Sequence, residues 1–93
     1  MATLIRVNGS RETVTPATPP AFTLEEMHGF VGGYIELLQF GDGSIMVLNE
    51  EGKLIGLPRN PLATAYAQAR VDLLPGDYIA GDAVVVSLQE MGE

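Results

Sequence analysis

Positively charged and hydrogen-bonding side chains gather in the second half of the sequence, around the start of a predicted helix. Lys53 is followed by Arg59, and then directly by Asn60 and Pro61. Asparagine is a good helix cap and proline suits the first turn. The free amides at a helix start favour an anion, and the forked guanidinium of arginine suits phosphate. We therefore predict a small anion site with Arg59 as its main ligand, supported by Lys53 and Asn60. The alternative is that Asn60 only caps the helix and Arg59 is simply exposed.

A nucleotide-sized anion would also need an aromatic ring against which a base can stack. The chain has three tyrosines that could stack a base, Tyr34, Tyr66 and Tyr78, and we take Tyr34 as the candidate for this role. Packing in the core or at an interface is the alternative, because tyrosine commonly does both. The predicted ligand-binding set is thus Lys53, Arg59, Asn60 and Tyr34.

The residues needed for catalysis or for a metal centre are scarce. His28 is the only histidine and there is no cysteine. A zinc site needs several nitrogen or sulfur ligands, and no serine lies in the strained strand-to-helix turn of a nucleophile elbow. Glu50 and Glu51 are adjacent in a predicted turn, so their carboxylates are expected to point apart into water. We predict that the protein is not an enzyme and holds neither metal nor cofactor.

The charge of the chain restricts its partners. Twelve acidic residues stand against five basic ones, for a formal net charge of −7. A field of this sign repels nucleic acid and anionic membranes. It favours cationic partners, and an acidic protein can mimic DNA, for which Glu50, Glu51 and Asp82 are the candidate carboxylates. The simpler interpretation is that acidity keeps a small protein soluble.

The sequence also carries no pattern for export or for membrane insertion. The first residues lack a basic segment followed by a long apolar core, so no signal peptide is predicted. No apolar run approaches the roughly 20 residues that a spanning helix needs. We expect a cytoplasmic protein without membrane contact.

The elements that must position these residues follow from hydrophobic periodicity and turn residues. Asn8 and Gly9 are typical of a tight hairpin turn, and three prolines interrupt residues 16–21. Thr23 with Glu26 forms a capping-box pattern. The predicted strands are 3–7, 11–15, 34–40, 44–49, 53–57 and 83–88, the predicted helices are 24–31 and 62–70, and residues 90–93 are expected to fray.

This order of elements predicts an α+β fold, a small antiparallel sheet with two short helices. Residues 1–93 form one domain, divided into an N-terminal hairpin (1–15), a proline-rich loop (16–21) and a core (22–93). The residues expected to be buried in the sheet are Ile35, Leu37, Ile45, Val47, Leu54, Val84 and Val86. Because such a core is thin, we also expect a homodimer that covers some apolar surface.

Four segments carry a resemblance to a known family: Val31–Glu36, Asn49–Leu54, Gly56–Asn60 and Asp77–Val86. Together they resemble the domain of unknown function 3846, which occurs in phage and bacterial proteins, and the likeness covers residues 22–93. The resemblance implies a phage or mobile-element origin. It supplies no assigned chemistry and no catalytic residues.

Three functions are compatible with these features. The first is a phage-type binding module that acts in the host cytoplasm against a host defence, by sequestering a small anionic ligand or by masking a host protein. The alternatives are an acidic DNA mimic and an accessory interaction domain without a ligand.

Overall fold

One antiparallel sheet organises the chain. A computed structural model describes residues 2–92, and within them five strands pair in the order β2-β1-β5-β4-β3. The α+β prediction is confirmed, with a five-stranded sheet and two helices. The elements are β1 (Ala2–Ile5), β2 (Arg11–Val14), α1 (Leu24–Val31), β3 (Ile35–Gln39), β4 (Ser44–Asn49), α2 (Pro61–Gln68) and β5 (Ala83–Ser87).

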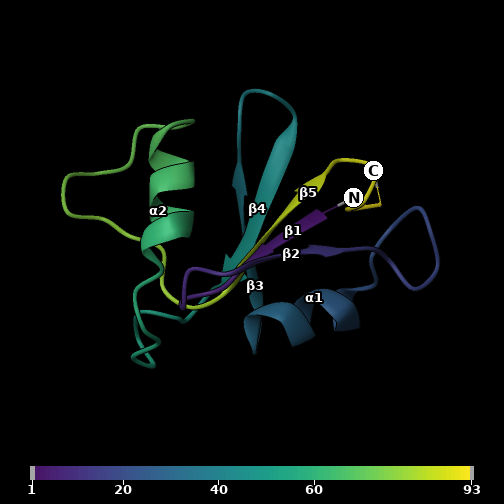
Figure 1. The fold of residues 1–93 in the computed structure, drawn as a ribbon, viewed down its shortest axis with the longest axis horizontal. Helices are drawn as coiled ribbons and strands as arrows, with labels where there is room; N and C mark the ends of the chain where they lie inside the picture. The colour runs from purple at the N-terminus through teal and green to yellow at the C-terminus, as the bar shows by residue number, and fades with distance from the viewer. Residues whose placement is uncertain (1, 93) are drawn as a thin grey trace.

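The two helices lie on different sides of the sheet (Figure 1). Met27 and Val31 of α1 pack against alternate residues of the central strands, including Val47 and Val84. Ala63 and Ala67 of α2 pack on the other side, against Met46 and Ala83. Successive side chains of a strand point to opposite faces, so each central strand contributes to both cores. This explains why β4 and β5 are almost entirely apolar.

Burial in these central strands agrees with the sequence. Ile45, Val47, Val84 and Val86 are each at most 2% exposed. The predictions for Leu37 and Leu54 are wrong, because these side chains are 41% and 84% exposed, and Ile35 is only partly buried. Leu37 lies in β3, at the edge of the sheet.

The predicted strand at residues 53–57 is also absent, and this accounts for Leu54. Residues 50–56 form successive turns in which Ile55 N–H donates to Glu51 O at 3.0 Å and Leu57 N–H donates to Gly52 O at 2.9 Å. The reason lies in the sheet: β4 is already flanked by β3 and β5, so no place beside it remains. The segment folds on itself and leaves its apolar side chains in solvent.

Helix α1 begins and ends as its sequence indicates. Thr23 accepts from Glu26 N–H, the Glu26 carboxylate accepts from Thr23 N–H, and Gly32 closes the helix at φ 79°. Backbone N–H groups of Thr23 and then Ala17 hold the pKa of Glu26 below its ordinary value. The second bond also fixes the proline-rich loop to the helix. His28 is partly buried.

The C-terminal residues differ from the prediction of a frayed end. Ser87 N–H donates to Glu90 Oε1 at 2.9 Å, and Glu90 N–H donates to Ser87 Oγ at 3.1 Å. Phe22 N–H donates to Glu90 O, which ties this turn to the start of α1. Glu90 is therefore only 6% exposed. Burial by itself raises the pKa of this carboxyl, but hydrogen bonds, first the one from Ser87 N–H, hold it below its ordinary value. Residue 93 lies outside the described residues.

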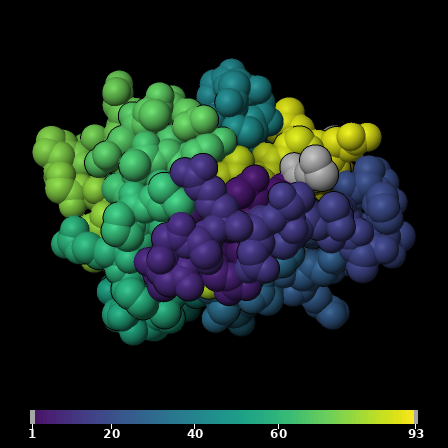
Figure 2. Space-filling view, viewed as in Figure 1, coloured from purple at the N-terminus to yellow at the C-terminus, as the bar shows by residue number. Residues whose placement is uncertain are grey.

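The N-terminal hairpin lies across one side of the molecule, between the segment that contains α2 and the proline-rich loop (Figure 2). It pairs as predicted, but Arg6 N–H donates to Ser10 O, so the loop has three residues and ends at Gly9 with φ 89°. The loop is thus one residue longer than an Asn8-Gly9 turn.

Neither helix within residues 2–92 has the length and apolar content that crossing a bilayer requires.

Candidate binding groove

A surface groove of about 330 Å³ lies where the α2 side of the sheet passes beyond α2 itself. Its floor is apolar and comes from β3, β4 and the segment that follows α2. The side chains that form this floor are Leu38, Leu48, Leu73 and Ile79. The segment that follows α2 and the turns that follow β4 line the groove at this end of the sheet.

The rim of the groove is charged and mostly acidic. Glu36, Glu50, Lys53 and Asp77 all line it. Lys53 Nζ donates to Asp77 Oδ1, and this bond, together with one from Tyr78 N–H, holds the pKa of Asp77 below its ordinary value. Among the described residues, Glu36 and Glu50 have no ion-pair partner. The groove therefore retains negative charge once its lysine is paired.

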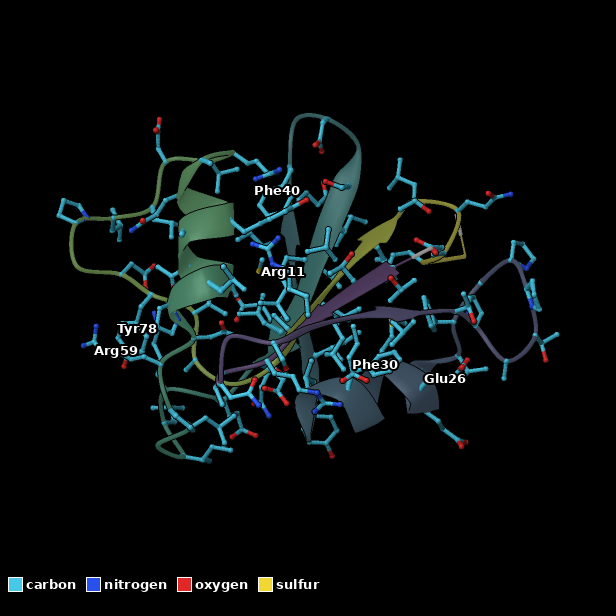
Figure 3. The ribbon with its side chains drawn as sticks, in the orientation of Figure 1. Arg11, Glu26, Phe30, Phe40, Arg59 and Tyr78 are labelled. Atoms are coloured by element: carbon cyan, nitrogen blue, oxygen red, sulfur yellow. The ribbon has the colours of Figure 1, made fainter. Side chains whose placement is uncertain are left out.

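Two of the predicted ligand residues meet at one aromatic ring. The guanidinium of Arg59 lies 3.9 Å from the centre of the Tyr78 ring, and Lys53 Nζ lies 4.9 Å from it. A backbone bridge between Arg59 and Ala80 brings these segments together. Figure 3 shows Arg59 and Tyr78 side by side near α2. Both cations are thus held by the ring face, where cation–π attraction stabilises them.

Asn60 lies inside the protein and away from the groove. Its side chain is 0% exposed, and its Oδ1 accepts from Ala63 N–H at 3.0 Å, which caps α2. Its Nδ2 donates to Ile5 O and to Gly81 O, both at 2.9 Å. All three contacts are with the backbone, so this side chain joins α2, β1 and the start of β5. The interpretation of Asn60 as a helix cap is confirmed.

Tyr34 stands apart from the other candidates. It is 67% exposed, at the start of β3, with its ring centre 5.8 Å from that of His28. It lines a separate shallow depression together with His28, Glu51 and Ile55. The structure therefore brings the side chains of Lys53 and Arg59 together. The side chain of Asn60 is buried, and Tyr34 lies at a different depression, so neither joins them.

The sequence reasoning missed most of the groove. Glu36 and Leu38 are two residues apart in a strand, so they share a face, and that spacing was available in the sequence. Asp77 and Tyr78 fall in a segment that was noted for the family resemblance and was not assigned to the predicted ligand-binding set. Their proximity to Lys53 depends on the fold of residues 69–80, which carries no periodic pattern. Within residues 2–92 there is no cluster of three or more side chains suited to bind a metal.

Fold and groove together define a class: a small α+β protein with one helix on each side of an antiparallel sheet and a partly acidic surface groove. The chain belongs to the family of the domain of unknown function (DUF3846), whose model matches residues 2–93. The match includes the N-terminal hairpin and the proline-rich loop, beyond the region where the resemblance was first seen. No curated protein and no solved structure matches the chain.

Proposed function

We propose that this protein is a non-enzymatic binding module whose groove docks onto another protein and masks it. The observation that supports this most directly is the combination of an open apolar floor with two carboxylates, Glu36 and Glu50, that have no ion-pair partner within residues 2–92. Apolar floors supply affinity through burial, and charged rims select the partner. A phage-encoded protein acting in the host cytoplasm, as the resemblance implies, would use this surface against a host protein.

Exposed apolar side chains beside the groove support protein docking. Leu54, on its rim, is 84% exposed, and Leu74, next to Leu73 of the floor, is 78% exposed. Fully burying a leucine side chain contributes about 1.5–3 kcal/mol. Removing these apolar side chains from water lowers the free energy, so a partner that covers them gains affinity.

The two other versions of the binding hypothesis have less support. An anionic ligand would meet Glu36 and Glu50, while Lys53 is already bonded to Asp77 and Asn60 is inaccessible. A DNA mimic needs free carboxylates. Asp82 instead accepts from Val7 N–H at 2.9 Å and from Arg6 at 3.4 Å.

The test compares two exposed leucines. Leu54→Glu places a charge in the groove, whereas Leu24→Glu places the same charge on α1, at a leucine that is 55% exposed. The tagged wild type and both variants are used to capture proteins from cells of the source host, with quantitative mass spectrometry. We expect one or a few captured proteins to be lost with Leu54→Glu and retained with Leu24→Glu.

Two results would overturn the proposal. One is equal capture by all three proteins. The other is calorimetric binding of a nucleotide that Arg59→Ala abolishes while the fold is intact, because this would support the anion-binding version.

A further inference from the structure

The outer edge of β3 is open, and its hydrogen-bonding pattern can be worked out. Phe40 N–H donates to Ser44 O, and Glu50 N–H donates to Tyr34 O. Bonds in an antiparallel pair alternate along the strand, so the even-numbered residues between them also bond to β4. The N–H and C=O groups of Ile35, Leu37 and Gln39 therefore point away from β4. Within the described residues β4 is the only strand that pairs with β3.

This edge also lacks most of the features that usually block strand addition. Proteins protect edges with proline, lysine, bulges or a covering segment. β3 contains none of these residues, and its pairing with β4 runs without interruption from Ile35 to Gln39. Its one charged residue is Glu36. The edge is thus a template for an added strand.

The side chains of β3 specify what that strand should carry. Glu36 and Leu38 point to the groove, and Leu37 points to the α1 side, where it is 41% exposed. A strand added next to β3 presents alternate residues to the same two faces. The residue beside Leu38 should be apolar and the residue beside Glu36 should be basic. The residue between them, beside Leu37, should be apolar.

We propose that the partner binds as an extended segment that adds antiparallel to β3 and carries the order apolar, apolar, basic. The antiparallel direction follows from the slightly greater stability of that pairing, and it places the residue beside Leu38 first in the segment. The basic residue reaches Glu36 and Glu50 at the groove rim. This inference rests on the proposed function and names the chemistry of its partner.

A second copy of this chain fits the same edge less well. In a two-fold antiparallel pairing centred on Leu37, the Glu36 side chains of both copies would lie on one face as diagonal neighbours, about 7–8 Å apart. Each would stand beside its own Glu50, and each chain carries a net charge of −7. A basic segment of another protein meets attraction where a second copy meets repulsion.

The experiment uses the full chain and a capped peptide, Ser-Thr-Leu-Val-Lys-Thr-Ser, with NMR-detected hydrogen exchange. In the free protein the Leu37 amide should exchange fast and the Leu38 amide, bonded to β4, slowly. With peptide at about ten times its Kd, exchange at Leu37 should slow about tenfold, whereas Leu38 should change little.

Two matched peptides separate strand addition from simple burial in the groove. N-methylation of the valine, whose N–H faces β3 in this register, should weaken binding about tenfold, and N-methylation of the lysine, whose N–H faces away, should not. Exchanging the peptide lysine for glutamate should weaken binding about fivefold, and Glu36→Lys should restore it.

The outcomes that overturn this inference differ from those that overturn the proposed function. Equal binding of both N-methylated peptides, no binding of the parent peptide, or sedimentation as a dimer through β3 each reject strand addition by a basic segment. They leave the capture assay with Leu54→Glu and Leu24→Glu as the independent test of the groove.

Discussion

The two edges of the sheet differ in how they meet solvent. At one edge, β2 presents Arg11, Glu12 and Thr13, all exposed, and Pro16 follows soon after. At the other edge, β3 presents leucines and a single glutamate beside an apolar groove. β2 carries two charged residues and is followed by a proline, features that natural edge strands use to prevent association, whereas β3 carries one charged residue and no proline. The contrast supports the proposal that a partner strand adds to β3.

The largest effect is expected in the strand that supports β3. Ile45 of β4 lies opposite Gln39 and is 1% exposed, so Ile45→Ala should cost about 2–5 kcal/mol of unfolding free energy. Leu37→Ala, on β3 itself, should cost less than about 1 kcal/mol because its side chain is partly in water. Urea denaturation measures both. Equal costs would mean that β3 packs as a core strand and would weaken the comparison.

How far the sequence predicts this architecture depends on where its pattern is periodic. The capping box at Thr23 and Glu26 and the apolar run of β4 predict their elements correctly, because local bonding and burial on both faces decide them. Residues 53–57 look like a strand, and only the occupied positions on both sides of β4 prevent it.

The residues of the groove also differ in whether the sequence alone predicts their role. Arg59 and Lys53 were predicted from their charge, and Tyr78 was one of three candidate rings, but only the fold shows that it is the ring on which both cations lie. Glu90 was expected to be frayed, although Ser87 and Glu90 have the same spacing as Thr23 and Glu26. The omission came from applying the capping pattern only in front of a predicted helix.

The second prediction concerns Asn60, whose side chain joins α2 to β1, the strand next to β2. Asn60→Ala removes two donors to the carbonyls of Ile5 and Gly81 and also removes the cap of α2. Unpaired buried carbonyls make a cost of about 2–3 kcal/mol the expected result. Thr23→Ala, which removes only a cap, should cost about 1 kcal/mol. Thermal denaturation compares the two, and hydrogen exchange should increase at β1 and β2 more than at β3.

The third prediction compares two carboxylates. Glu90 is expected to stabilise the fold, and Glu36 is expected to contribute to binding only. The folded-state pKa of Glu90 is lowered, so its contribution to stability is present above the unfolded pKa and is lost as the pH falls through the folded one. Glu90→Gln should therefore cost about 1 kcal/mol at neutral pH, and the difference from the wild type should close in acid.

Glu36→Gln is the matched substitution on β3. It should change stability by less than about 0.5 kcal/mol, because Glu36 is exposed and has no ion-pair partner among the described residues. Urea midpoints measured from neutral to acidic pH test both variants. A gap at Glu90 that persists in acid would contradict the assigned role of its charge.

The last prediction exchanges the residue types of the two edge strands. These substitutions should give the smallest change in stability and the clearest change in peptide binding. Leu37→Lys gives β3 the residue type that protects edges and should shift stability by no more than about 0.5 kcal/mol. It should also weaken binding of the basic peptide, because a lysine replaces the apolar side chain that packs beside the peptide valine and adds a second positive charge near the peptide. Replacing Arg11 and Thr13 by leucine gives β2 an apolar edge without the groove that Glu36 and Leu38 line. If that double variant gained peptide binding equal to that of β3, edge composition alone would explain the difference. We expect no such gain, because the carboxylates and the floor that select the peptide lie only beside β3.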